Sequence, residues 1–444
     1  MALRIFENSP QVGKLLVIGL IAIGLMIPLS MLRGLIAERQ QMRDQAVASV
    51  AGGWGGELTA GGPILRVPFT TETKTPAGEV LRENHDLFIL PNRLNIESQL
   101  EQQPSRHVGI YEVPVYIVRM KLTGSFRIAD TLAAAGAINA GDKAVSGAGI
   151  AWNQARLRLP MSDVRSVREL SAASAAGRAM SFGPGTPRGF PGIESRIDLS
   201  QFTPEAEFPF SIEIRVAGSH AISFLPTAAT TQVHLDAEWR DPQFQGAFLP
   251  AAYRLGAPGF VADWQVLALN RSFSQSWADD QVDGARLRSA AFGVELYQSV
   301  DVYQRSERAV KYALLFIALT FLSFFGWEVG GKVRMHPVQY LFIGLALSTF
   351  YLLLIALAEH LAFGLSYWLG AAALVLLLGV YVAGALESTR RGALLAAVMS
   401  GVYALLYLLV LSESYSLLLG AIALFLVLAA VMLATRRQRW EGAP

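Results

Sequence analysis

Residues 338–358 read VQYLFIGLALSTFYLLLIALA, a run of 21 residues without a charged side chain. An α-helix needs about 20 apolar residues to cross the roughly 30 Å hydrocarbon core of a bilayer, so this run is long enough to span one. Five further apolar runs of similar character occur in the 444-residue chain, at Leu15–Leu32, Tyr312–Trp327, Tyr367–Leu386, Ala393–Leu411 and Ser416–Ala434. One such run is also typical of a buried helix in a soluble protein. Six together predict a membrane α-helical bundle with six transmembrane helices, one followed by five.

The composition excludes several classes of function. Charged residues make up 16% of the chain, against about 25% in an average soluble protein. The 37 basic and 35 acidic residues leave a net charge of +2, which provides no electrostatic basis for binding nucleic acid. The chain has no cysteine, and this excludes disulfides, thiolate metal sites and cysteine nucleophiles.

The first apolar run is interpreted as an uncleaved signal anchor. Its length exceeds the usual 7–15 residues of the apolar region of a signal peptide, and a small-x-small cleavage site does not follow it. Short cytoplasmic loops are enriched in Lys and Arg. One side of the predicted topology collects these charges: Arg4, Lys14, Lys332, Arg334, Arg390, Arg391, Arg436, Arg437 and Arg439. The opposite loops, 359–366 and 412–415, contain none. We therefore expect both termini in the cytoplasm and the long central region outside.

These assignments divide the chain into five parts. Residues 1–14 and 436–444 are the expected cytoplasmic ends, residues 15–33 the first transmembrane helix, and residues 309–435 a five-helix transmembrane bundle. Residues 34–308 are the expected exported domain, mainly β, with a helical stalk at its start. Apolar residues recur at spacings of three and four over Arg33–Val50, which predicts the stalk. The glycines of 52–56 are expected to end it.

Short alternating segments predict the strands of this domain. They lie at Pro63–Phe69, Asp86–Leu90, Val113–Met120, Phe208–Val216, Val233–Trp239, Ala262–Leu267 and Phe292–Leu296. Helices are expected near Ile128–Ile138, capped by Asp130, and near Asp163–Ala176, capped by Ser162 or Asp163. Both a sandwich and an open, barrel-like sheet fit this pattern.

Common catalytic motifs are absent from the sequence. It contains no GxSxG, SxxK, HExxH or GK[ST], each of which carries a known chemistry. The glycine-rich run GPGTPRGFPG at 183–192 contains three prolines and is interpreted as a loop rather than a phosphate cradle. The six histidines have no partner at metal-ligand spacing. We therefore predict no enzyme activity, no catalytic or metal-binding residues and no cofactor.

Polar residues near the membrane lie at the ends of the predicted spans. A charge at the bilayer centre costs at least about 2.5–3.5 kcal/mol, and these positions avoid that cost. Glu359 and His360, an adjacent acid and imidazole at the outer face, form the candidate functional pair because they could sense pH or a ligand. The candidate juxtamembrane residues are Arg305, Glu307, Arg308, Glu328 and His336. Ordinary anchoring at the interface is the alternative interpretation of all of them.

Several strings together resemble one family. They are RSERAVKYALLFIALTFLSFF at 305–325, HPVQYLFIGLALSTFYLLLIALAEH at 336–360, GGPILRVPF at 61–69, GIYEVPVY at 109–116, FQGAFLP at 244–250 and IPLSMLRGLIAER at 27–39. The chain resembles the CreD family, inner-membrane cell envelope integrity proteins of Gram-negative bacteria. The resemblance implies a bacterial inner-membrane location, a two-component regulon, and a role in envelope stress and colicin tolerance. It implies no catalytic or ligand residues.

Three functions are compatible with these observations. The leading one is a non-enzymatic inner-membrane protein whose periplasmic domain binds an envelope component, with the lipid bilayer and envelope proteins as partners. The alternative is a transporter or lipid-handling protein, which requires a polar cavity in the helix bundle lined by Glu359 or His360. The third is a periplasmic hydrolase, which requires Ser, His and Asp joined by hydrogen bonds in a cleft.

Overall fold

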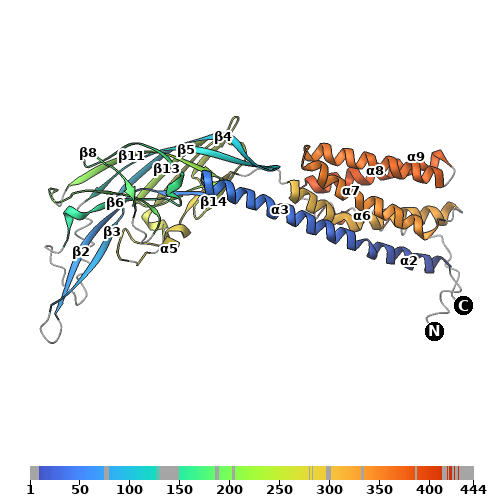
Figure 1. Cartoon of the computed structure of the whole chain (residues 1–444), viewed down its shortest axis with the longest axis horizontal. Helices are drawn as coiled ribbons and strands as arrows, with labels where there is room; N and C mark the ends of the chain where they lie inside the picture. Colours follow the sequence, from blue (N-terminus) through green and yellow to red (C-terminus); the bar gives the residue numbers. More distant parts are fainter. Residues whose placement is uncertain are drawn as a thin grey trace. The chain divides into compact units, whose positions relative to one another are not determined.

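The computed structural model describes residues 10–74, 80–127, 129, 150–185, 190–202, 206–279, 281–282, 284–296, 302–331, 335–385, 388–412 and scattered positions between 418 and 429. The chain divides into two compact units. Met1–Arg43 with Val300–Pro444 form one, here called the membrane unit, and Asp44–Ser299 form the other, here called the β unit. Figure 1 labels the elements of both.

Long helices make up the described part of the membrane unit. They are α2 (Pro10–Gly24), α3 (Met26–Trp54), α6 (Val302–Gly331), α7 (Pro337–Ala358), α8 (Phe363–Ala385) and α9 (Thr389–Leu411). Among the described residues, four helical segments are long and apolar enough to cross a bilayer: Gly13–Trp54, α7, α8 and α9. They confirm a membrane protein with several apolar helices. The expected span 312–327 lies within α6, which is not among these four, and 416–434 falls largely outside the described residues. The count of six therefore stays a prediction.

Aromatic rings and one glycine determine how α7 packs. The ring of Phe350 meets those of Tyr351, Tyr367 and Tyr403 edge-on, with centroids 4.7–5.5 Å apart. This cluster joins α7 to α8 and α9, which lie side by side in Figure 1. Gly344 lies so close to Leu25 that a Cβ at this position would overlap the leucine side chain. Small residues allow this kind of close helix approach in membranes.

The helix α3 ends inside the β unit, as the glycines of 52–56 predict. The ring of Trp54 lies between the guanidinium groups of Arg106 and Arg168, 4.4 and 4.7 Å from its centroid, and Arg168 donates to the Trp54 carbonyl at 2.6 Å. Gly55 has a φ of +139°, and a Cβ there would lie 2.6 Å from the Ala217 carbonyl oxygen. Glycine is therefore required where the helix stops.

The described residues of the β unit form three sheets, which confirms the mainly-β prediction. The eight-stranded sheet has the order β15 (Ala252–Leu255), β16 (Phe260–Leu267), β13 (Thr230–Ala237), β4 (Arg93–Val108), β5 (Tyr111–Arg127), β11 (Glu207–Ser219), β7 (Val167–Ala175), β8 (Arg178–Ala179). The six-stranded sheet has the order β17 (Ser276–Ala278), β3 (Val80–Ile89), β2 (Ile64–Lys74), β6 (Arg156–Pro160), β10 (Gly192–Arg196), β9 (Gly183–Pro184). The four-stranded sheet has the order β1 (Leu58–Gly61), β12 (Ala221–Leu225), β18 (Phe292–Leu296), β14 (Pro242–Gly246).

Strict alternation along the strands builds one large core. In β4, Leu94, Ile96 and Leu100 are buried, whereas Glu97 and Gln99 are exposed. Successive side chains of a strand point to opposite faces, so each sheet has one apolar face. The core cluster takes buried side chains from all three sheets. The other face of the eight-stranded sheet is left to polar groups.

The expected strands are confirmed, since each of the seven predicted segments overlaps a strand. The helix expected at 163–176 is wrong. Val164–Ser166 form a single 3-10 turn, capped by the Asp163 carboxylate, which accepts from the Arg165 backbone N–H at 2.9 Å. The rest is β7, an antiparallel neighbour of β11. Its alanines favour a helix in isolation, and pairing with the exposed edge of β11 overrides this local preference. The helix expected at 128–138 lies, apart from residue 129, outside the described residues.

Candidate functional site

Glu359 lies in a cluster that joins three helices of the membrane unit. It follows α7 directly, and its side chain is 11% exposed. Its Oε1 accepts from the hydroxyl of Tyr303 in α6 at 3.3 Å and lies 3.4 Å from Nε of Arg39 in α3. The carboxylate is therefore already neutralised by an ion pair within the unit.

His360 does not join this cluster. Its side chain is exposed, and in the described part of the chain its imidazole makes no hydrogen bond. Of the other candidates at this end, Arg305 lies over the ring of Phe363, 5.6 Å from its centroid, and Glu307 is exposed. Arg308 is half-buried. The adjacent acid and imidazole expected from the sequence are thus neighbours in sequence without a shared contact.

Glu328 and His336 lie near the other end of α7. The Glu328 carboxylate pairs with the ammonium group of Lys14 and accepts from the Tyr340 hydroxyl at 3.2 Å and from the Met335 N–H at 3.3 Å. His336 caps α7, because its Nδ1 accepts from the Val338 N–H at 3.3 Å. These contacts fix helix ends. The Glu328 carboxylate has three of these partners and the His336 imidazole has one, and a functional role for either residue stays a prediction.

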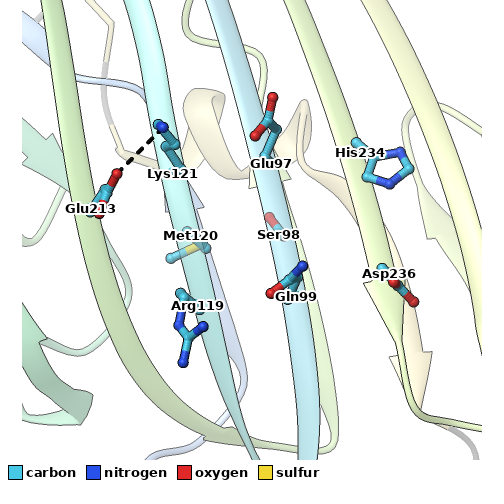
Figure 2. A pocket seen from close by; sticks show the side chains of 9 residues that line it. All are labelled: Glu97, Ser98, Gln99, Arg119, Met120, Lys121, Glu213, His234 and Asp236. Atoms are coloured by element: carbon cyan, nitrogen blue, oxygen red, sulfur yellow. Dashed lines mark ion pairs between the residues drawn. The ribbon is translucent and has the colours of Figure 1, made fainter.

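The β unit contains a groove of about 290 Å³ on the exposed face of its eight-stranded sheet. Figure 2 shows the side chains that line it. Three neighbouring strands supply most of its polar groups: His234 and Asp236 from β13, Glu97 and Gln99 from β4, Arg119 and Lys121 from β5. This volume is at the lower end for ligand sites, so the groove suits a small ligand or one short stretch of a larger one.

Strand register arranges these side chains in two rows across the sheet. In one row His234 lies opposite Glu97, and Glu97 opposite Lys121. In the other, Asp236 lies opposite Gln99, and Gln99 opposite Arg119. Each row therefore has one carboxylate on the β13–β4 side, Glu97 or Asp236, and one basic group on β5. Glu213 of β11 also lines the groove.

Some of these charged side chains form ion pairs with residues at the edge of the groove. Lys121 Nζ lies 3.5 Å from Glu213 of β11, the pair marked in Figure 2. His234 Nδ1 lies 2.7 Å from Asp263 Oδ1 of β16. Arg119 has its nearest carboxylate, Glu101, at 3.9 Å. Pairs of this kind between exposed groups contribute about 0–1 kcal/mol each, so they leave the charges open to a ligand.

Sequence reasoning did not single out these groove residues. The strand β4 was not predicted, although apolar residues alternate with polar ones from Leu94 to Leu100. Polar side chains at alternate positions, as in Glu97–Gln99, Arg119–Lys121 and His234–Asp236, are the signal that could have found the exposed face. The order of the strands in the sheet is not a local property, so no sequence pattern could predict the two rows.

The closest arrangement to a hydrolytic triad in the described residues is in the six-stranded sheet. His85 Nε2 lies 3.0 Å from Thr71 Oγ1, and His85 Nδ1 lies 2.7 Å from Asp279 Oδ2. Thr71 is only 2% exposed, and the groove lies in the other sheet. A nucleophile must be able to reach its substrate, which this hydroxyl cannot do. The three side chains instead fasten β17 to the β2–β3 hairpin.

The apolar helices and the large β unit define an integral membrane protein that carries one β-rich domain. The family model described as "Inner membrane protein CreD" matches residues 11–441, and the chain therefore belongs to the CreD family of inner membrane proteins. This confirms the resemblance seen in the sequence. The chain is 27% identical over 421 residues to "Inner membrane protein CreD" of Escherichia coli (strain K12), covering 94% of this chain and 90% of that one.

Among solved structures, the chain is similar to a putative nutrient binding protein from Legionella pneumophila. The TM-score is 0.29 at 8% identity, with 60% of this chain and 79% of that chain covered. No conclusion on function follows from a similarity of this size.

Proposed function

We propose that this chain is a non-enzymatic inner-membrane protein that supports the integrity of the cell envelope and its tolerance of stress. Its β unit acts on the periplasmic side by binding an envelope component. The groove on the eight-stranded sheet carries this proposal, because it places charges of both signs on an exposed face that the core does not need.

The proposed topology has both termini in the cytoplasm, six transmembrane helices and residues 34–308 in the periplasm. The distribution of Lys and Arg supports it. The absence of cysteine from the chain makes single introduced cysteines clean reporters of position. A membrane-impermeant maleimide should label Arg178→Cys and His360→Cys in intact cells, but Arg390→Cys only after permeabilisation. The reverse pattern would refute the topology.

We propose that the membrane unit anchors the β unit and does not form a transport path for ions, solutes or lipids. In the described helices the interior is filled by aromatic rings around Phe350, and Glu359 is engaged by Arg39 and Tyr303. Neither observation favours transport or lipid handling. The bundle therefore supplies location, and the β unit supplies recognition.

The test is complementation of a deletion strain. Loss of the gene should raise sensitivity to detergent, bacteriocins and cell-wall antibiotics. The wild-type gene should restore tolerance, and the double variant Arg119→Gln/Lys121→Gln should not. Arg254→Gln, an exposed arginine in β15 outside the groove, is the matched control and should complement fully. Unchanged sensitivity of the deletion strain would refute the role in the envelope, and full complementation by the double variant would refute the role of the groove.

A further inference from the structure

We infer that the groove binds a short extended peptide with free ends, holding its ammonium group at Asp236 and its carboxylate at Arg119. This rests on the proposed function, because it names the chemical class of ligand for the same groove. The row Asp236–Gln99–Arg119 carries the inference (Figure 2).

The two ends of this row have opposite charges that do not satisfy each other. In the described part of the chain the Asp236 carboxylate has no hydrogen-bond or ion-pair partner, and Arg119 reaches its only described carboxylate, Glu101, at 3.9 Å. Asp236 and Arg119 are separated by the intervening strand β4. Neighbouring strands lie about 4.8 Å apart, so the two charged positions are roughly 10 Å apart, too far for an ion pair.

The middle of the row suits a peptide bond. Gln99 lies between the two charges, and its side-chain amide can both donate to a carbonyl and accept from an N–H. A ligand lying across the strands thus meets a carboxylate, a neutral amide and a guanidinium in order. A peptide with free ends presents the complementary order of ammonium, amide and carboxylate.

The centre of the second row, Glu97 opposite Lys121, has the same polarity. Glu97 lies on β4, next to the strand β13 that carries Asp236, and Lys121 lies on β5 together with Arg119. Glu97 accepts one hydrogen bond, from the Asn95 amide at 3.3 Å. His234 on β13 and Glu213 of β11, beside Lys121, also line the groove, so the order from acidic to basic is complete only in the row Asp236–Gln99–Arg119. A purely anionic or purely cationic ligand would meet repulsion at one side.

The separation of the charges sets the length of the peptide. An extended chain covers at most about 3.3–3.6 Å per residue, so three residues span roughly 10 Å. A tripeptide, or a three-residue stretch with an amine and a carboxylate at that spacing, matches the row. A dipeptide is too short to reach both ends.

The test uses the full-length protein in detergent micelles, with trialanine as the probe and saturation-transfer NMR as the readout. Trialanine with free ends should bind saturably. N-acetyl-trialanine and trialanine amide should each bind about tenfold more weakly, because a hydrogen bond to a charged group is lost in each. Dialanine should also bind more weakly than trialanine.

Variants assign each end of the peptide to its residue. Asp236→Asn should abolish the preference for the free amine while keeping the preference for the free carboxylate. Arg119→Gln should do the opposite. Asp241→Asn and Arg254→Gln remove the same charges from exposed positions outside the groove and should keep both preferences, which also excludes a general effect of net charge.

Equal binding of free and capped trialanine, or no saturable binding at all, would overturn the inference. The same result together with failed complementation by Arg119→Gln/Lys121→Gln would leave the proposed function standing and show that the groove takes another ligand. Specific trialanine binding together with full complementation by that double variant would support the inference and refute the role of the groove in the proposed function.

Discussion

The membrane unit and the β unit place their charged side chains differently. In the membrane unit, charges gather at the two ends of α7, where Glu328 and Glu359 each have a basic partner and a tyrosine hydroxyl. In the β unit, charges spread in rows over an exposed sheet face, with pairs such as Lys121–Glu213 at 3.5 Å. The first arrangement satisfies charge where water is scarce. The second leaves charge accessible, which is what recognition of a polar ligand requires.

A third arrangement lies beneath the surface of the β unit and gives the largest expected effect. Arg158 and Glu194 are 5% and 2% exposed and lie 3.6 Å apart, and burial lowers the pKa of the Arg158 guanidinium. Arg158→Leu should destabilise the β unit by about 3 kcal/mol, the lower end of the range for a broken buried pair, because the buried Glu194 carboxylate loses Arg158 and keeps the partly exposed Arg156 at 3.4 Å. Urea unfolding followed by tryptophan fluorescence measures this.

The control for that prediction is Arg165→Gln, which removes a guanidinium that is 74% exposed from its pair with Asp163. It should cost clearly less stability than Arg158→Leu, because water screens an exposed pair. Equal losses in the two variants would show that burial does not distinguish these pairs.

The packing of the membrane unit is tested by Gly344→Leu. The added side chain would overlap Leu25 and crowd Phe321, and overpacking of this kind costs about 1–3 kcal/mol. The purified protein in detergent should therefore unfold at a lower temperature. Gly401→Leu, at a position in α9 where a Cβ meets nothing within 4 Å, is the matched control. A similar loss in both would contradict the close approach of α7 to Leu25.

The comparison of the two charge arrangements is sharpened by a pair of double-mutant cycles. Lys14→Met with Glu328→Gln should show a coupling energy of about 0.5–3 kcal/mol, as contacting residues in one network do. Lys121→Met with Glu213→Gln, on the exposed sheet face, should show about 0.2–1 kcal/mol. Thermal unfolding of the four variants and two doubles supplies the values. A larger coupling on the sheet face would reverse the proposed contrast.

The smallest effect concerns Asp163, whose pKa is lowered chiefly by the hydrogen bond from the Arg165 side chain. The ionised Asp163 carboxylate stabilises the folded state fully above the unfolded-state pKa of about 3.9. This stabilisation is lost as the pH falls through the lower pKa that Asp163 has in the folded state. The pair is mostly exposed, so the contribution is below about 1 kcal/mol. Asp163→Asn should reduce the loss of stability between pH 5 and pH 2 by about that amount. An identical acid profile for wild type and variant would contradict it.

Several features of this protein follow from the sequence alone. A run such as 338–358 is charge-free over the length of a bilayer, and whether a helix can span a membrane depends only on such a local stretch. Local sequence likewise predicted the helix over 33–50, its end at the glycines of 52–56, the seven strand segments and the family resemblance. Each of these depends on neighbouring residues. The positions of Glu328 and Glu359 at helix ends were predicted for the same reason.

Only the tertiary structure decided which of these elements meet. The sequence 167–175 became a strand because the edge of β11 was available to pair with it. Glu359 pairs with Arg39 rather than with its sequence neighbour His360, because helix packing places α3 at the end of α7. The row of Asp236, Gln99 and Arg119 joins residues up to 137 positions apart in the sequence, and strand order and register set that row. Strand order and register both depend on pairing between residues that are distant in the sequence, which no local pattern encodes.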